Sequence, residues 1–245
     1  MSDLSVSVDL QENYKDYYQN GESKWRWLGA LDKADNIISL CRGLSVNSLV
    51  EIGAGDGAIL KRLSELSFAN NFYALDISET GVDVIKNRDI SQLRECAVFD
   101  GYTTPYSDQE FDLAILSHVV EHVEYPRKLL AEACRIAKYV YLEVPLEDTV
   151  RLPQDFTPDK VGHINFYSPK TFRRLVQTCN LKVLKQRITN PSKEIYTFQQ
   201  GKKGLLDFYI KEAFLSMLPN VATEFFTYHL SILSTREEIL EVRKS

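Results

Sequence analysis

Residues 48–57 read Ser-Leu-Val-Glu-Ile-Gly-Ala-Gly-Asp-Gly, and this stretch decides the fold. The apolar run from Ser48 to Ile52 is typical of a buried strand. Glycine accepts positive φ and puts no Cβ between backbone and ligand, and a helix start offers N–H groups without intrahelical partners. The stretch therefore predicts a strand, a ligand-binding turn and a helix, marked by Gly53, Gly55 and Gly57 and then by Ile59, Leu60, Leu63 and Leu66.

The acids around this turn indicate what kind of ligand it binds. The turn itself fits the relaxed dinucleotide fingerprint G-x-G-x-x-G/A. However, Glu51 precedes the first glycine by two residues, where a carboxylate repels a pyrophosphate and suits a cationic ammonium. Asp76 ends a second apolar run, 72–75, where an acid can accept hydrogen bonds from both ribose hydroxyls. The predicted ligand has a ribose and an amino-acid-like head, and a nicotinamide-dependent oxidoreductase remains the alternative.

The motifs, taken together, resemble those of the class I S-adenosylmethionine-dependent methyltransferases. The similar segments follow one another in the family's order over roughly residues 45–190: 51–57, 74–78, 99–106, 111–123 and 143–145. Residues 162–169, Gly-His-Ile-Asn-Phe-Tyr-Ser-Pro, are similar to a segment of the small-molecule branch that includes the quinone-biosynthesis O-methyltransferases.

This resemblance implies a set of cofactor-binding residues. Glu51 is expected to hold the methionine ammonium of S-adenosylmethionine, and Asp76 its ribose. Asp100 and Gly101 are expected to contact adenine, and Ser117 to lie beside the sulfonium. The full predicted set is Glu51, Gly53, Ala54, Gly55, Gly57, Asp76, Ile77, Asp100, Gly101, Ser117 and His118.

Alternating strand and helix patterns predict a parallel sheet covered on both faces. Strands are expected near 48–53, 71–76, 95–99, 112–117, 139–144 and 181–188. Helices are expected near 25–40, 57–67, 79–88, 126–137, 169–179 and 205–218. The resemblance implies an α/β doubly wound sheet of seven strands in the order 3-2-1-4-5-7-6, whose last strand, 225–233, is antiparallel. We predict one domain, 1–245, with an N-terminal lid, 1–30, and a helical cap, 190–222.

Methyl transfer needs a base only if the acceptor begins as a protonated hydroxyl or ammonium. Histidine is the side chain that we consider for this role. His118 and His122 are the predicted catalytic residues; the alternatives are a turn residue for His118 and a local hydrogen bond for His122. We expect the acceptor to contact some of Tyr14, Tyr17, Tyr18, Trp25 and His163, and we interpret His229 as structural.

Residues 118–122 also spell H-x-x-E-H, the inverse zinc-peptidase motif. That motif must lie on a helix, whereas here it ends a predicted strand. Some quinone-pathway relatives carry an acid, two further residues, and Glu-His at this place, and they use a divalent metal. Because His118 stands where the first acid belongs, we assign no metal ligands from the sequence.

Composition limits the classes of acceptor and the cellular compartment that we expect for this protein. The chain has 245 residues, 44% of them hydrophobic, and a net charge of −5 without a basic cluster, which argues against nucleic acid as the acceptor. The four cysteines show no metal or redox spacing, and no apolar run approaches the ~20 residues of a membrane span. We predict a cytoplasmic protein, in which the 205–218 helix is a cap, a homodimer interface or a membrane-surface element.

The sequence thus predicts an S-adenosylmethionine-dependent methyltransferase that moves a methyl group to an O or N atom of a small-molecule acceptor. The expected reaction is an in-line displacement in which positioning supplies most of the barrier reduction. Besides the oxidoreductase, a non-catalytic cofactor-binding protein of the same fold stays open, and so does a protein or RNA acceptor.

Overall fold

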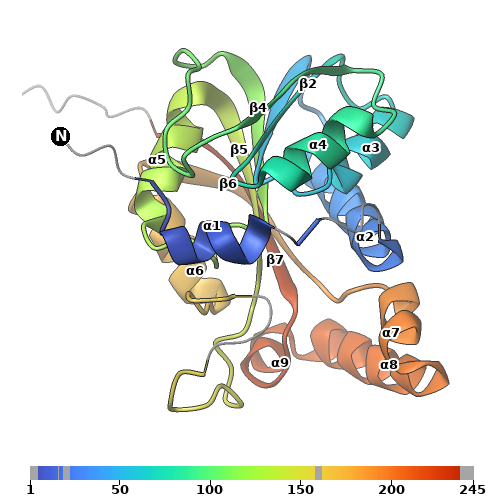
Figure 1. Ribbon diagram of the computed structural model, residues 1–245. Helices are drawn as coiled ribbons and strands as arrows, with labels where there is room; N and C mark the ends of the chain where they lie inside the picture. Colours follow the sequence, from blue (N-terminus) through green and yellow to red (C-terminus); the bar gives the residue numbers. More distant parts are fainter. Residues whose placement is uncertain (1–4, 16, 19–22, 158–161, 238–245) are drawn as a thin grey trace, which may run out of the picture.

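One mixed sheet of seven strands organises the part of the chain that the computed structural model describes, residues 5–15, 17–18, 23–157 and 162–237 (Figure 1). Its order is β3-β2-β1-β4-β5-β7-β6. The first five strands pair in parallel, and β7 is antiparallel to both β5 and β6. The predicted sheet is therefore confirmed, with strands β1 Ser48–Ile52, β2 Asn71–Asp76, β3 Leu93–Val98, β4 Phe111–Ser117, β5 Ala137–Pro145, β6 Leu181–Thr189 and β7 His229–Arg236.

Helices cover both faces of this sheet, as parallel strands require. Apolar side chains of α2 (Lys24–Cys41), α3 (Ala58–Glu65) and α4 (Glu79–Asn87) form one core layer with the strands. Those of α5 (Pro126–Ile136) and α6 (Pro169–Gln177) form the layer on the opposite face. β1 and β4 are buried over nearly their whole length, which explains their continuous apolar sequence.

The chain departs from the predicted pattern near its two ends. A short helix that the sequence did not predict, α1 (Val8–Lys15), lies in the N-terminal segment. The predicted cap contains three helices, α7 (Lys193–Gln200), α8 (Lys202–Met217) and α9 (Pro219–Phe225). The prediction that the last strand begins at Phe225 was wrong, because Pro219 starts a further helix in the first-turn position that suits proline.

The glycine turn after β1 is fixed from both sides. The N–H groups of Gly53 and Ala54 both donate to the carbonyl oxygen of Leu75 in β2, over 2.7 and 3.0 Å. Gly53 has φ +73°, and a Cβ at this position would lie 2.5 Å from Cγ2 of Val119. Asp56, inside the turn, accepts from Arg26 Nε over 2.7 Å and pairs with Arg88. Only glycine fits this approach of the β1 turn to β4.

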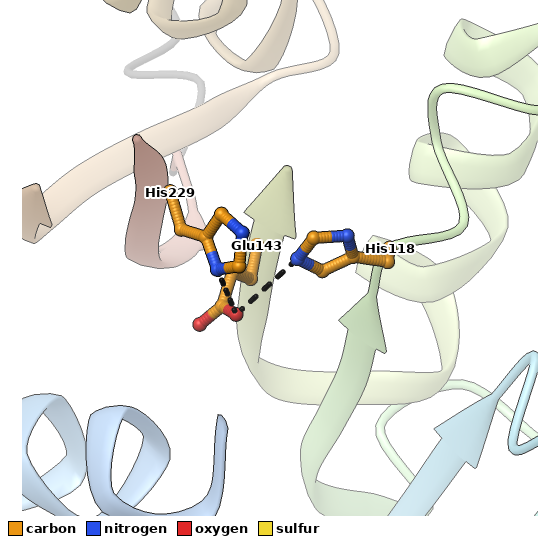
Figure 2. A group of neighbouring side chains, drawn as sticks. All are labelled: His118, Glu143 and His229. Atoms are coloured by element: carbon orange, nitrogen blue, oxygen red, sulfur yellow. Dashed lines mark ion pairs between the residues drawn. The ribbon is translucent and has the colours of Figure 1, made fainter. Parts of the chain in front are cut away.

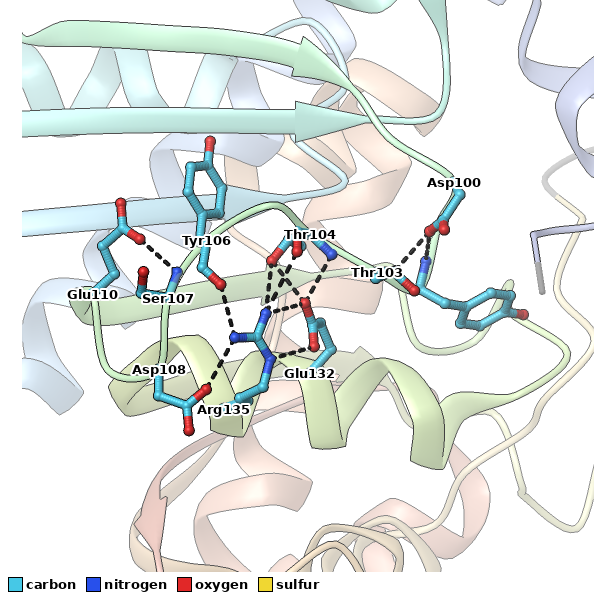
Figure 3. A network of polar contacts seen from close by, with 10 residues as sticks. Asp100, Thr103, Thr104, Tyr106, Ser107, Asp108, Glu110, Glu132 and Arg135 are labelled. Atoms are coloured by element: carbon cyan, nitrogen blue, oxygen red, sulfur yellow. Dashed lines mark hydrogen bonds and ion pairs between the residues drawn. The ribbon is translucent and has the colours of Figure 1, made fainter. Parts of the chain in front are cut away.

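The loop after β3 is held to α5 by Arg135 (Figure 3). Its guanidinium donates to the carbonyl oxygen of Tyr106 over 2.7 Å and to both oxygens of Glu132 over 2.7 and 2.9 Å. Glu132 in turn accepts from the N–H and the hydroxyl of Thr104. One arginine therefore supports the loop that leaves the carboxyl edge of the sheet after β3.

Replacing Arg135 by alanine should lower the free energy of unfolding by about 1–2 kcal/mol, because several partly buried acceptors lose a charged donor. Urea denaturation followed by circular dichroism measures this change. The matched control is Arg94→Ala on β3, whose bonds to Asn70 and Asn71 are exposed and whose loss should cost less than ~0.5 kcal/mol. Equal losses in the two variants would contradict this role for Arg135.

Candidate functional site

A pocket of about 510 Å³, including its open mouth, lies at the carboxyl edge of the sheet. This is the edge where parallel α/β sheets bind ligands. Five stretches of the chain converge there: the N-terminal segment, the glycine turn, the end of β2, the loop after β3 and the turn after β4. The lining residues are Val6, Leu10, Tyr14, Tyr18, Gly53, Asp76, Ile77, Phe99, Gly101, His118, Val119, His122 and Val123.

Two buried acids lie at the ends of β1 and β2. Glu51 is 1% exposed, and its Oε2 has no hydrogen-bond partner. Burial raises the pKa of Glu51 well above its usual value; Asp56 and Asp76 add to this shift, and Lys33 opposes it. Asp76 accepts from the N–H of Gly55 over 2.7 Å and of Ser78 over 2.8 Å, while burial raises its pKa to about 6. A cation placed beside Glu51 would favour its ionised form.

The two residues predicted to meet adenine differ in their surroundings. Gly101 lines the pocket at φ +92°, and a Cβ there would lie 2.3 Å from Cγ1 of Val6. The Asp100 carboxylate accepts from the backbone N–H groups of Tyr102 and Thr103, over 2.7 and 2.6 Å (Figure 3). The Asp100 carboxylate therefore shapes the loop, and its contact with a ligand stays a prediction. The contact of Ser117 with a ligand also stays a prediction; its buried hydroxyl has no hydrogen-bond partner.

The N-terminal segment forms one wall of the pocket. Val6 donates its N–H to the carbonyl oxygen of Asp100 over 2.9 Å, and the Tyr18 ring covers Gly55, where a Cβ would lie 2.9 Å from the hydroxyl oxygen. Of the four aromatic residues predicted here, Tyr14 and Tyr18 line the pocket. Tyr17 and Trp25 are 44% and 39% exposed, and Trp25 stacks on Phe198 of α7.

Several residues that line the pocket were not predicted from the sequence. Val6, Leu10, Phe99, Val119 and Val123 supply its apolar surface. Phe99, Val119 and Val123 lie in the family-like segments 99–106 and 111–123 but were not singled out, and Val6 and Leu10 belong to no motif. The neighbouring glycines hint at two of them, because Gly53 and Gly101 lack the Cβ that Val119 and Val6 would meet. No residue of 190–222 is among the lining residues, so the predicted cap stays a prediction that this pocket does not support.

All four histidines of the chain lie near the turn after β4. His118 has φ +58°, a conformation that is uncommon outside glycine. Its N–H donates to the carbonyl oxygen of Glu143 over 2.8 Å, and its ring lies 4.6 Å from that of His229. The rings of His122 and His163 lie 4.8 Å apart. His229, which we interpreted as structural, is brought beside His118 by β7.

Glu143, at the end of β5, joins two of these histidines (Figure 2). Its Oε1 lies 3.5 Å from Nε2 of His118 and 3.7 Å from Nδ1 of His229. Its Oε2 accepts hydrogen bonds from the side chains of Tyr141, Ser231 and Asn36. Burial alone would raise the pKa of Glu143, but the contact with His118 holds it well below its usual value. Burial also lowers the pKa of His229 to about 3.

His122 is a buried imidazole whose tautomer follows from its contacts. Its Nδ1 lies 3.2 Å from the carbonyl oxygen of Gly162 and 3.4 Å from the hydroxyl of Tyr14. Because a carbonyl only accepts, Nδ1 carries the hydrogen and Nε2 carries the lone pair. Burial lowers the pKa of His122, and His163 and His118 add to this shift against Glu121. The ring is therefore neutral near pH 7, and the lone pair on Nε2 can accept a proton.

The H-x-x-E-H residues lie in the turn after β4 rather than on a helix. This placement agrees with the expected strand end and excludes the helical geometry that the peptidase motif requires.

Among the described residues, no helix is long and apolar enough to cross a membrane.

Comparisons with known proteins agree with this architecture. Residues 28–186 match the model of a family described as a methyltransferase domain. Over 126 residues the chain is 28% identical to the uncharacterized protein MJ1123 of Methanocaldococcus jannaschii; the match covers 51% of this chain and 57% of that relative. The chain thus spans little more than half the length of this curated relative.

Two solved structures illustrate the likeness in fold. One is the geranyl diphosphate C-methyltransferase of Streptomyces coelicolor A3(2), crystallised with Mg2+, geranyl-S-thiolodiphosphate and S-adenosyl-L-homocysteine. It has a TM-score of 0.65 and 14% identity, covering 95% of this chain and 100% of that one. The other is the phosphoethanolamine N-methyltransferase 2 of Haemonchus contortus, with a TM-score of 0.60 and 14% identity, covering 92% and 60%. Because the family model covers more than half of the chain and the sheet has the predicted order, the chain belongs to the class I S-adenosylmethionine-dependent methyltransferases.

Proposed function

We propose that this methyltransferase moves a methyl group to an oxygen or nitrogen atom of a small molecule that binds beside His118 and His122. The observation that carries the proposal is the pocket at the carboxyl edge of the sheet, which combines a Cβ-free turn, the buried acid Asp76 and a neutral histidine. A second buried acid, Glu51, lies in β1 just before that turn. The acids favour a zwitterionic nucleoside over a dinucleotide, and the histidine suits an acceptor that must lose a proton.

The chain's own residues fit the cofactor. The buried Oε2 of Glu51 has no hydrogen-bond partner, and it would accept from the methionine ammonium. Asp76 would bind the ribose, and the pocket surface at Ile77, Phe99 and Gly101 would take the adenine. When bound, S-adenosylmethionine supplies an activated methyl group on a sulfonium. The protein's part is to hold the acceptor in line with that group and to exclude water.

On the acceptor side, His122 is the best placed base. It lines the pocket, and its Nδ1 hydrogen bond leaves Nε2 as the atom that takes a proton. Tyr14 and Tyr18 provide an aromatic wall, and we extend the proposal to the predicted lid, 1–30, of which residues 5–15, 17–18 and 23–30 are described. Part of the predicted lid, residues 1–4, 16 and 19–22, lies outside the described residues. The resemblance at 162–169 and the net charge of −5 support a small acceptor rather than nucleic acid.

Calorimetric titration with S-adenosylmethionine and with NAD+ separates this proposal from its main rival. Only the sulfonium cofactor should bind, because Glu51 repels a pyrophosphate. A panel of phenols, catechols and amines, assayed through formation of S-adenosylhomocysteine, then searches for the acceptor. Binding of NAD+ alone would favour the oxidoreductase, and cofactor binding with no product from any acceptor would favour a non-catalytic protein.

Binding of the cofactor should release a proton from Glu51. The raised pKa of Glu51 keeps a share of the carboxyl groups protonated in the free protein, and the ligand's ammonium lowers that pKa on binding. Calorimetry near pH 7 in buffers of different ionisation enthalpy measures the released proton. Glu51→Gln should abolish the release and weaken binding about 10–100-fold, since a charge-assisted bond contributes ~1.5–3 kcal/mol. The matched control is Asp89→Asn, because the side chain of Asp89 is 96% exposed. Proton release and cofactor affinity should both stay unchanged in this variant. Buffer-independent heats in the native chain would contradict the role of Glu51.

His122 should titrate below pH 6.5 and carry its hydrogen on Nδ1 when neutral. Burial lowers its pKa, so protonation occurs only as the pH falls through that lowered value, and the base form is present above it. Long-range 15N–1H NMR of the four histidine rings reads pKa and tautomer together, with His122→Gln as the assignment control. His163→Gln should move the pKa of His122 upward, because His163 lowers it. A neutral ring protonated on Nε2 would exclude the proposed base.

A further inference from the structure

Two groups of side chains, each with one member that lines the pocket, have the composition of metal ligands. Within the described part of the chain these are His118, Glu143 and His229 in one group, and Glu121, His122 and His163 in the other. In each group the ligand atoms lie within 4.8 Å of one another. We propose that the first group binds a divalent transition-metal cation, with Zn2+ as the best match, and that an oxygen atom of the acceptor completes the coordination.

The register of the sheet brings the three residues of this group together. Ser117 of β4 pairs with Glu143 of β5, and Glu143 pairs with Ser231 of β7. His118 follows Ser117 directly, and His229 begins β7 two residues before Ser231. Because β4, β5 and β7 are neighbours in the sheet, the site is built on rigid strand ends, as a preorganised metal site should be.

Atoms without hydrogen bonds point at the centre of the group (Figure 2). Glu143 Oε1 and His118 Nε2 are buried and have no hydrogen-bond partner. Their separation of 3.5 Å, and that of 3.7 Å between the same Oε1 and His229 Nδ1, exceed hydrogen-bond length. Ligand atoms ~2.1 Å from a tetrahedral zinc ion lie roughly 3.4 Å apart, which is close to both separations. A cation would compensate a fully buried carboxylate oxygen that otherwise costs stability.

The outer contacts orient the same three residues. Tyr141, Ser231 and Asn36 all donate to Glu143 Oε2, which leaves Oε1 to face the histidines. Nδ1 of His118 lies 3.3 Å from Oε1 of Glu121, which presents Nε2 to the centre. A carboxylate beside the far nitrogen of a histidine is the usual arrangement around a zinc site, and here Glu121 Oε1 lies in that place without a hydrogen bond.

The donor set indicates which cation fits. Two imidazoles and one carboxylate suit zinc and other first-row transition metals, whereas Mg2+ and Ca2+ prefer oxygen ligands. Three protein ligands leave a coordination position for a water molecule or a substrate. The second group is a poorer candidate, because Nδ1 of His122 donates to Gly162 and Nδ1 of His163 pairs with Glu147 over 2.7 Å.

The role of the metal rests on the proposed function. His118 lines the pocket, so a hydroxyl group of the acceptor can reach the open position. Coordination lowers the pKa of that hydroxyl, and its proton leaves to solvent or to Nε2 of His122. The oxygen then forms a bond to the methyl carbon while the carbon–sulfur bond breaks and its electron pair returns to sulfur as a thioether. The inference narrows the acceptor class to hydroxyl compounds that bind metals.

Zinc affinity of the full chain, measured by competition with a chromophoric chelator, tests the site. One equivalent of Zn2+ should bind, Mg2+ should not compete, and Co2+ should give visible d–d bands. His229→Gln and His118→Gln should weaken zinc binding by more than roughly 100-fold, since loss of even an outer-shell partner costs about 10–100-fold. The matched control, His163→Gln, should keep the affinity of the native chain.

Equal zinc affinity in the native chain and in His229→Gln would overturn the inference, and so would a loss confined to His163→Gln. Circular dichroism of each variant in the presence of a chelator verifies folding. Calorimetry with S-adenosylmethionine on the same samples separates the two proposals. A chain that binds zinc at His229 but not the cofactor keeps the metal site and loses the proposed function. A chain that binds the cofactor but no zinc keeps the proposed function and loses the metal site.

Discussion

The site depends on the contact between the β1 turn and its neighbouring strands. Gly53 and Ala54 donate to one carbonyl oxygen of β2, and the missing Cβ of Gly53 makes room for Val119 beyond β4. A side chain in this turn would separate strands that must converge, and with them Glu51, Asp76 and His118. The same contact buries Glu51 without a hydrogen-bond partner for one oxygen. The stability of the turn and the selectivity for a cationic ligand that we propose for it therefore have one physical origin.

Much of this architecture was predictable because its causes are local. A buried strand, alternate glycines and an amphipathic helix can be recognised in a stretch of about 20 residues of sequence. Alternation of such strand and helix units predicts a parallel sheet. The acids at the ends of β1 and β2 follow from the same short motifs. The same motifs carry the family resemblance, which in turn implied the sheet order, and both the family and the order were confirmed.

Features that depend on distant contacts were not predictable. His229 lies 111 residues after His118, and only the antiparallel register of β7 against β5 brings the two rings together. In the same way, Val6 enters the pocket by pairing with the backbone of Asp100, and nothing in its own sequence signals this. The run from Phe225 to Tyr228 looked like strand because of its aromatic residues, yet α9 includes Phe225 and packs Ala222 into the core.

The α8 helix is the feature that the site does not explain. It carries apolar side chains together with five charged ones, Gly204 is its only buried residue among those described, and Leu206, Tyr209 and Met217 are 60–69% exposed. The segment before β7 holds it in place: Lys211 donates to the carbonyl oxygen of Thr227 over 2.7 Å, and the hydroxyl of Tyr228 donates to the carbonyl oxygen of Lys211 over 2.8 Å. No residue of α8 lines the pocket, so its exposed apolar side chains have no part in the proposed function.

A crystal structure of the chain with S-adenosylhomocysteine is the most direct measurement of the central claim. The account predicts the ligand's amino group within hydrogen-bond reach of Glu51, its ribose hydroxyls on Asp76 and its adenine beside Gly101. A nucleoside bound away from the glycine turn, or a dinucleotide with its pyrophosphate against Gly53 and Gly55, would contradict it.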